Sequence, residues 1–116
     1  MPKLLLVDDA ENNLLTLEAL FQDEGFEVDT AGSCAAARER LTAAGLPYAL
    51  VLLDLHLGDG SGVELVPLIR ERHPATRVLI MSGSVDREQL PAQADGCFAK
   101  GRAFPELLAL VRGALG

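Results

Sequence analysis

The sequence predicts an α/β domain in which helices cover both faces of a parallel sheet. Short apolar runs alternate with helical patterns along the whole chain, and this alternation favours a parallel sheet with right-handed crossovers. The 116 residues suit one domain, and 49% of them are hydrophobic, which is enough for a core without disulfides. No repeat, low-complexity tract or linker divides the chain. Residues 1–116 are therefore expected to form one domain.

Five strands are expected. Continuous apolar runs predict buried strands, whereas the alternating sequence EVDTA predicts a strand at or near the edge of the sheet. The fifth strand has the weakest pattern. In chain order the strands are Lys3–Val7, Glu27–Ala31, Leu50–Leu53, Val78–Met81 and Cys97–Ala99.

Apolar residues at helical spacing predict helices after each strand. The first such helix ends at Gly25, the second at Gly45 and Pro47, and the last has Pro105 near its first turn, where proline is tolerated. The apolar positions that define the helices are Leu14, Leu17 and Phe21; Cys34, Ala37, Leu41 and Ala44; Gly62, Leu65, Val66 and Ile69; and Phe104, Leu107, Leu108, Val111 and Leu115.

The fourth helix is expected to be irregular. Residues 86–94 contain few apolar side chains, and Pro91 lies inside the segment. An interior proline removes a backbone donor and costs about 3 kcal/mol or more. This helix should therefore be short, kinked or partly unwound.

The composition narrows the range of functions. A net charge of −7 argues against direct binding to nucleic acid or to an anionic membrane. Cys34 and Cys97 lack zinc-ligand spacing and are expected to be small buried hydrophobes. No signal peptide is visible, and no apolar run approaches the roughly 20 residues of a membrane span. The protein is expected to be cytoplasmic.

Polar residues follow the predicted strands at the point where each strand ends. Asp8 and Asp9 follow the first strand, Asp54 the third, Ser82 the fourth and Lys100 the fifth. In an open parallel sheet, ligands bind outside the carboxyl ends of the strands. We expect these five residues to converge there if the strand order permits it.

Three carboxylates held together repel one another, and a divalent cation removes that penalty. Oxygen ligands of this kind select Mg²⁺, which proteins hold with one or two carboxylates plus phosphate oxygens and water. A carboxylate can also act as a nucleophile toward phosphorus and form an aspartyl phosphate. Lysine and serine are suitable partners for the oxygens of a transferring phosphoryl group.

Each residue also has a simpler interpretation. Asp8 or Asp9 could be the N-cap of the first helix, and Asp54 could be a turn residue. Ser82 could belong to a plain turn, and Lys100 could be a solvated surface lysine. The side chains of His56 and His73 have no metal-ligand partners in sequence, and His73 before Pro74 indicates a helix end. The convergence of the five residues, rather than any one of them, favours a functional site.

These residues resemble the receiver domain of bacterial two-component response regulators. The resemblance covers almost the whole chain, and its matching segments are LLLVDDAENN, VLLDLHLGDGSG, VLIMSGS and CFAKG. It implies a flavodoxin-like fold with strand order 2-1-3-4-5. It also implies that a sensor histidine kinase or a histidine phosphotransfer protein donates a phosphoryl group to the aspartate that ends the third strand, and that Mg²⁺ is required.

By position in the family, the resemblance makes Asp54 the phosphoacceptor and Asp9 the direct acidic metal ligand. Asp8 would act largely through water, and the backbone carbonyl of His56 would complete the protein's share of the metal shell. Ser82 would hydrogen-bond the phosphoryl group, and Lys100 would pair with a phosphoryl oxygen. Phosphorylation would then alter the surface of the last two helices and the fifth strand, which is a two-state switch.

The sequence departs from the usual receiver pattern at four places. Gly101 and Gly58 stand where receivers often have proline, and both changes are expected to loosen loops beside the site. Cys97 occupies the usual switch-aromatic position, and Phe98 is displaced by one residue, which points it to the other face of the strand and into the core. The segment from Ser82 to Lys100 is about one helical turn shorter than usual, which again indicates a reduced fourth helix.

The leading hypothesis is a phosphorylatable receiver that catalyses its own phosphoryl transfer and slow dephosphorylation, and that is a switch rather than a metabolic enzyme. The alternative is a receiver-like module that binds protein partners without phosphorylation, whose complex would be indifferent to Asp54→Asn. A flavin-binding protein is a third class, but the acidic sequence DDAE would repel a flavin phosphate. Met1 directly before the first strand suggests a receiver at a natural N-terminus, either standalone or cut from a longer regulator. The kinase, the downstream protein partner and the oligomeric state stay open.

Overall fold

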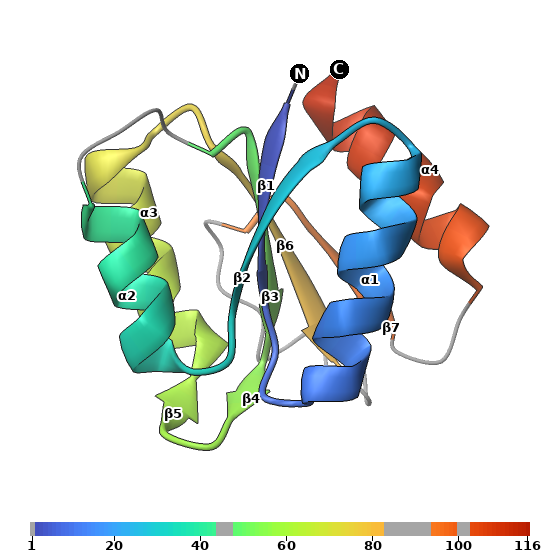
Figure 1. Cartoon of the computed structure of the whole chain (residues 1–116). Helices are drawn as coiled ribbons and strands as arrows, with labels where there is room; N and C mark the ends of the chain where they lie inside the picture. The colour runs from blue at the N-terminus through green and yellow to red at the C-terminus, as the bar shows by residue number, and fades with distance from the viewer. Residues whose placement is uncertain (1, 44–47, 83–93, 100–102) are drawn as a thin grey trace.

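The computed structural model describes residues 2–43, 48–82, 94–99 and 103–116 of the chain. A five-stranded parallel sheet with the order β2-β1-β3-β6-β7 forms its centre (Figure 1). The strands of this sheet are β1 (Lys3–Val7), β2 (Glu27–Ala31), β3 (Leu50–Asp54), β6 (Arg77–Ser82) and β7 (Gly96–Ala99). The labels β4 (His56–Leu57) and β5 (Gly60–Ser61) belong to a separate two-stranded hairpin. Counted without that hairpin, the order is 2-1-3-4-5, so both the flavodoxin-like topology and the edge position of β2 are confirmed.

The helices lie on both sides of the sheet, with α1 and α4 on one face and α2 and α3 on the other (Figure 1). Their bounds are α1 (Glu11–Asp23), α2 (Cys34–Thr42), a single 3₁₀ turn η1 (Gly62–Glu64), α3 (Leu65–Arg72) and α4 (Phe104–Leu115). The second helix ends earlier than predicted, because the backbone of Ala43 is already extended. Apart from Ala94, the predicted irregular helix at 86–94 lies outside the described residues.

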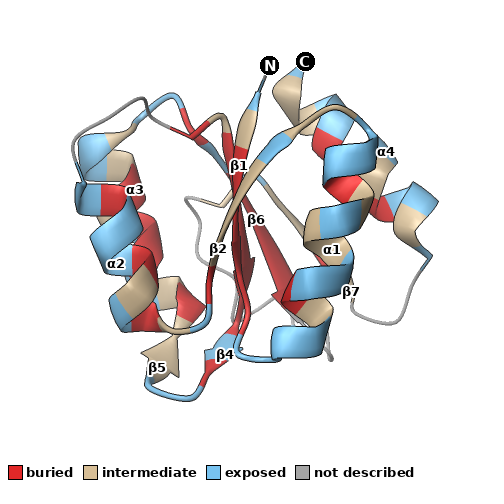
Figure 2. Ribbon diagram, in the orientation of Figure 1, coloured by how far each residue is buried: buried red, intermediate tan, exposed pale blue. Residues whose placement is uncertain are grey.

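Two apolar clusters explain the unbroken apolar run of β1. Leu5 and Val7 belong to the cluster under α2 and α3, whereas Leu4 and Leu6 belong to the cluster under α1 and α4. All four side chains are fully buried, and Figure 2 shows the buried colour running along the central strands. Full burial of one such side chain contributes about 1.5–3 kcal/mol. A strand covered on both faces therefore needs no polar position until it ends.

The last strand divides its side chains in the same way. Phe98 is buried in the cluster that contains Met81 and Leu107, which confirms its predicted place in the core. Cys97, one residue earlier, packs against the opposite cluster and is half-buried. Cys34 is buried, and neither thiol forms a disulfide. Within the described residues, no helix is long and apolar enough to cross a lipid bilayer.

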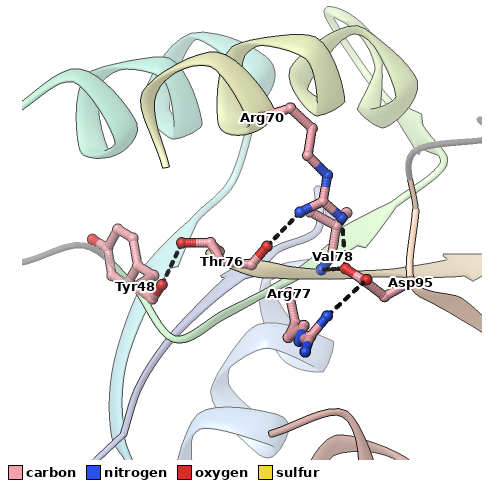
Figure 3. Close-up of polar contacts among 6 residues, drawn as sticks. All are labelled: Tyr48, Arg70, Thr76, Arg77, Val78 and Asp95. Carbon is pink, nitrogen blue, oxygen red and sulfur yellow. Dashed lines mark hydrogen bonds and ion pairs between the residues drawn. The ribbon is translucent and has the colours of Figure 1, made fainter. Parts of the chain in front are cut away.

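A polar network holds the amino edge of the sheet, where β6 and β7 begin (Figure 3). The carboxylate of Asp95 accepts hydrogen bonds from the Val78 amide at 2.7 Å and from the Arg70 guanidinium at 2.6 Å. Arg70 also donates to the carbonyl of Thr76, whose hydroxyl in turn donates to the carbonyl of Tyr48. The network connects α3 to the strands and lies at the end of the sheet opposite the predicted site.

Candidate phosphoacceptor and metal site

Three acidic side chains meet where β1 and β3 end. Val7 is in register with Leu53, so the residues that follow the two strands emerge at the same edge. Asp8, Asp9 and Asp54 each offer a carboxylate oxygen, and these oxygens all lie within 4.8 Å of one another. The structure thus brings together the three carboxylates that the sequence singled out. Three acidic groups at this separation, two of them buried, form an oxygen-rich site suited to a hard divalent cation.

Asp8 and Asp9 have different surroundings although they are neighbours. Asp8 is fully buried, and its carboxylate accepts hydrogen bonds from the amide of Ala10 at 2.9 Å and from the Asn13 side chain at 2.5 Å. Asp9 is exposed. The N-cap of α1 is Ala10, so the N-cap interpretation is wrong for both aspartates. Asp8 instead supports the turn that leads into α1.

Asp54 is the last residue of β3 and is 4% exposed. Its Oδ1 accepts a hydrogen bond from the backbone N–H of His56 at 3.2 Å. Gly62 packs directly against the backbone of Asp54: a Cβ at position 62 would overlap the Asp54 carbonyl oxygen. The close approach of these two backbone segments therefore requires glycine at position 62. This role was not predicted, because the sequence pattern assigned Gly62 only to the apolar face of a helix.

The hairpin formed by β4 and β5 follows Asp54 directly. His56 pairs with Ser61, and Leu57 pairs with Gly60. The Ser61 hydroxyl donates to the carbonyl of Leu55 at 3.0 Å and accepts from the amide of Val63 at 3.2 Å. Ser61 is also the N-cap of η1. The segment between the predicted phosphoacceptor and α3 is therefore hydrogen-bonded along most of its length.

Asp59, at the tip of this hairpin, contacts a different helix. Its carboxylate accepts hydrogen bonds from the backbone amides of Cys34 at 2.8 Å and Ala35 at 3.1 Å, at the start of α2. These bonds hold the pKa of the Asp59 carboxyl below its ordinary value. Neither Asp59 nor Asn13 was predicted to take part in the site. The signal for Asp59 was present as an acid between two glycines in LGDGSG, but its partners lie 24 and 25 residues away.

Of the two remaining predicted residues, the structure describes only the backbone of Ser82. Ser82 is the last residue of β6, and its backbone is in register with Ala99, the last residue of β7. Because Asp54 is in register with Met81, the backbone of Ser82 reaches the same edge of the sheet. Lys100 lies outside the described residues, as does Gly101.

The two histidines differ in position. His56 is exposed in β4, beside Asp54. His73 follows α3 as its C-terminal cap, which confirms the predicted helix end, and its Nε2 lies 2.9 Å from the carbonyl oxygen of Leu41.

A shallow hollow of about 360 Å³ adjoins the acidic site, between the start of α1 and the end of β2. Its walls include Asp8, Asp9, Leu14 and Leu15. Leu15 is 56% exposed, and no other large hydrophobic side chain of the described residues is classed as exposed. A larger hollow of about 760 Å³ lies at the amino edge of the sheet, near Lys3, and shares no residue with the acidic site. The chemistry of the carboxylates, rather than the size of the hollow, identifies the site.

The chain matches the family model of the response regulator receiver domain over residues 4–112. It therefore belongs to this family and is a receiver domain of two-component regulatory systems. Curated relatives include the photosynthetic apparatus regulatory protein RegA of Cereibacter sphaeroides, 39% identical over 80 residues that cover 69% of this chain and 42% of RegA. The transcriptional regulatory protein CpxR homolog of Haemophilus influenzae is 34% identical over 118 residues that cover 99% of this chain and 51% of that protein.

Solved structures of the family match nearly the whole chain. The response regulator TrrA from Thermotoga maritima, in complex with Mg²⁺ and BeF, has a TM-score of 0.88 and 29% identity, and the match covers 98% of this chain and 99% of that chain. The BeF₃-activated receiver domain of DrrB has a TM-score of 0.86 and 30% identity, and the match covers 99% of this chain and 97% of that chain. The first three curated relatives are longer, and the matches cover 42%, 44% and 64% of their lengths.

Proposed function

We propose that this receiver accepts a phosphoryl group on Asp54 from a phosphohistidine of a sensor histidine kinase or a histidine phosphotransfer protein, in a reaction that requires Mg²⁺. The observation that carries the proposal is the group of three carboxylates within 4.8 Å at the carboxyl ends of β1 and β3. A family relative, TrrA, binds Mg²⁺ together with a beryllium fluoride group. The site of this chain offers the same kind of hard oxygen ligand.

The acidic residues have different roles in binding the cation. Asp9 is exposed and suits direct coordination, whereas buried Asp8 already accepts two hydrogen bonds and suits contact through water. Asp54 and the backbone carbonyl of His56 complete the protein ligands in this proposal. When bound, Mg²⁺ supplies positive charge that balances the negative charge on the oxygens of the transferring phosphoryl group.

Asp54 acts as the nucleophile in the proposed transfer. One of its carboxylate oxygens forms a bond to phosphorus while the bond from phosphorus to the donor's imidazole nitrogen breaks, and the imidazole leaves with the bonding electron pair. The Ser82 hydroxyl and the Lys100 ammonium contact the phosphoryl oxygens in this proposal. Water later cleaves the acyl phosphate slowly, so the chain is a self-limiting switch rather than a metabolic enzyme.

The surroundings of the acidic site offer a place for the donor protein. The phosphohistidine has to approach the carboxyl edge of the sheet, where the exposed side chain of Leu15 lines the same hollow as Asp8 and Asp9. An exposed apolar side chain beside an acidic site gives a protein partner apolar contact area close to the chemistry. Phosphorylation then changes the affinity for a downstream protein target. In the proposed complex the donor protein covers the start of α1.

Intact mass spectrometry tests the proposal directly. Wild-type protein incubated with acetyl phosphate and Mg²⁺ should gain one phosphoryl group, and omission of Mg²⁺ should prevent the gain. Asp54→Asn should take up none, because an amide oxygen is a poor nucleophile, although it still accepts the His56 hydrogen bond. Failure of the wild type to take up phosphoryl from acetyl phosphate and from every cognate kinase tested would contradict the proposal.

A second candidate function is a receiver-like module that binds its partner without phosphorylation. It is favoured by the last strand, where Cys97 occupies the switch-aromatic position and packs against one core cluster while Phe98 is buried in the other. Such a module should bind its protein partner equally well as wild type and as Asp54→Asn. A change in affinity on phosphorylation of the wild type excludes it.

A further inference from the structure

The hairpin after Asp54 carries one of the proposed metal ligands and lies close to another. His56, whose backbone carbonyl is the proposed ligand, is in β4. Gly58 lies in the turn, and a Cβ built on it would be 3.9 Å from Oδ2 of Asp9. The geometry of this short hairpin therefore sets the distance between the His56 carbonyl and the carboxylates. A shift of about 1 Å in such a supporting segment is enough to weaken a site.

The composition of the hairpin gives it little rigidity of its own. Each strand has two residues, and an isolated hairpin of this size is at best marginally stable. Gly58 and Gly60 flank its tip, and glycine has more backbone freedom to lose than any other residue. An ordered metal ligand at His56 therefore needs support from outside the hairpin.

Asp59 supplies that support through α2. Its two carboxylate oxygens accept the amides of Cys34 and Ala35, two of the backbone donors that a helix leaves unsatisfied at its first turn. The positive end of the helix dipole favours a carboxylate at this position, and charge-assisted hydrogen bonds are roughly twice as strong as neutral ones. Figure 1 shows β4 and β5 beside the start of α2.

Contacts next to Asp59 show that hairpin and helix are packed together as well as hydrogen-bonded. A Cβ built on Gly60 would be 3.3 Å from the Cys34 sulfur, and that sulfur lies 3.6 Å from the Ser61 carbonyl oxygen. The remaining cap of α2 is separate, because the Ser33 hydroxyl accepts from the Ala36 amide at 3.0 Å. Asp59 thus joins the hairpin to α2, whereas the Ser33 hydroxyl caps the same helix end through the Ala36 amide.

We propose that Asp59 is a positioning residue of the Mg²⁺ site, which holds the hairpin against the first turn of α2 and thereby fixes the backbone carbonyl of His56 relative to Asp9 and Asp54. The inference rests on the proposed function and adds to it a residue that touches neither the cation nor the phosphoryl group. It makes the start of α2 part of the machinery that orders the site.

Isothermal titration calorimetry with Mg²⁺, at a temperature where circular dichroism shows every variant folded, tests this role. Asp59→Ala should weaken Mg²⁺ binding about 10-fold, the lower range seen when a supporting residue of a metal site is removed. Asp59→Asn removes the same charge but keeps one acceptor oxygen, so its loss of Mg²⁺ affinity should be smaller than that of Asp59→Ala. Ser33→Ala removes a cap of the same helix and should leave Mg²⁺ affinity within about two-fold of wild type, because it does not alter the hairpin.

Each outcome separates the two proposals. If the wild type binds Mg²⁺ and Asp59→Ala binds it with the same affinity, the positioning role is overturned and the proposed Mg²⁺ site stands. Equal losses in Asp59→Ala and Asp59→Asn assign the effect to charge, and equal losses in Asp59→Ala and Ser33→Ala assign it to helix stability; either result overturns the inference. Absence of Mg²⁺ binding in the wild type overturns the proposed function and the inference together.

Discussion

Asp8 and Asp9 show how two identical neighbours acquire different properties from their surroundings. Asp8 points into the turn before α1, where the Ala10 amide and Asn13 occupy its oxygens, and it is fully buried. Asp9 is exposed at the rim of the hollow beside the site. Direct coordination requires a carboxylate with oxygens available to the cation, and Asp9 meets this requirement better.

Substitution of the two residues should therefore have unequal effects on Mg²⁺ affinity. Asp9→Ala removes the proposed direct ligand and should weaken binding about 100-fold, whereas Asp8→Ala removes a residue that acts through water and should weaken binding about 10-fold. Isothermal titration calorimetry measures both constants. An equal or reversed order of the two losses contradicts the assignment of Asp9 as the direct ligand.

Gly62 provides a second residue-scale test, because its backbone lies against the carbonyl of Asp54. Gly62→Ala forces a Cβ into the Asp54 carbonyl oxygen, so β3 and η1 must move apart. The variant should lose about 1–3 kcal/mol of unfolding free energy in urea, and phosphoryl uptake from acetyl phosphate should slow because Asp54 is displaced.

Gly113→Ala is the matched control for this substitution. Gly113 lies in α4, and a Cβ built there meets nothing within 4 Å. Because alanine is the better helix former, this variant should gain about 0.5–1 kcal/mol and keep wild-type phosphoryl uptake. A Gly62→Ala protein that behaves like Gly113→Ala contradicts the close approach of the two segments.

At the scale of elements, Asp95 fixes the pairing of β6 and β7. Its carboxylate accepts the Val78 amide and contacts the guanidinium groups of Arg70 and Arg77 (Figure 3). Partial burial raises the pKa of this carboxyl, but the hydrogen bonds and the two arginines outweigh the burial and hold the pKa below its usual value of 3.8. The carboxylate form is therefore favoured by folding.

The stabilisation from Asp95 should depend on pH with a definite sign. Because the folded-state pKa is depressed, the stabilisation is present above the unfolded pKa near 4 and is lost as pH falls through the folded-state value. Urea unfolding of wild type and Asp95→Asn should show a wide stability gap at pH 6 that narrows below pH 4. Asp23→Asn, at the exposed end of α1, is the control and should show little gap at either pH. A gap for Asp95→Asn that stays constant with pH contradicts the interpretation.

At the scale of the whole molecule, the proposed function predicts that repulsion within the acidic site lowers stability when no cation is bound. The chain carries a net charge of −7, and three of its carboxylates lie within 4.8 Å of one another. Each pair of unit charges at this separation repels by about 3–4 kcal/mol at the effective dielectric constant of about 20 that is typical near a protein surface. Function and stability therefore compete at this edge of the sheet.

Asp54→Asn should consequently stabilise the protein in the absence of Mg²⁺ by about 1–3 kcal/mol, since it removes one charge and keeps an acceptor for the His56 amide. Mg²⁺ at ten times its dissociation constant should stabilise the wild type by about 1.4 kcal/mol and the variant much less. Thermal unfolding with EDTA and with Mg²⁺ measures both effects. A wild type and variant of equal stability in EDTA would show that the carboxylates do not repel.

Local patterns in the sequence predicted the strands and the polar residues that end them, whereas the strand order that brings Asp8, Asp9 and Asp54 together was implied by the resemblance to receiver domains. Apolar runs fix where buried strands lie, and the polar residue that ends each run marks the carboxyl edge of a parallel sheet. The displacement of Phe98 into the core followed from the alternation of side chains along a strand. The strand positions and the face of Phe98 need only the residues of one segment and the geometry of a sheet.

Only the tertiary structure revealed the long-range contacts that support the site and the opposite edge of the sheet. Asp59 accepts amides 24 and 25 residues away, Asp95 accepts an amide 17 residues away, and Gly62 is required by the backbone of Asp54 in a neighbouring strand. An aspartate that accepts backbone amides has no preferred partner residue type, so its partners leave no mark in the sequence. The sequence by itself therefore determined which side chains are candidates for the chemistry, and the packing of separate segments decided how Asp8, Asp9 and Asp54 are held.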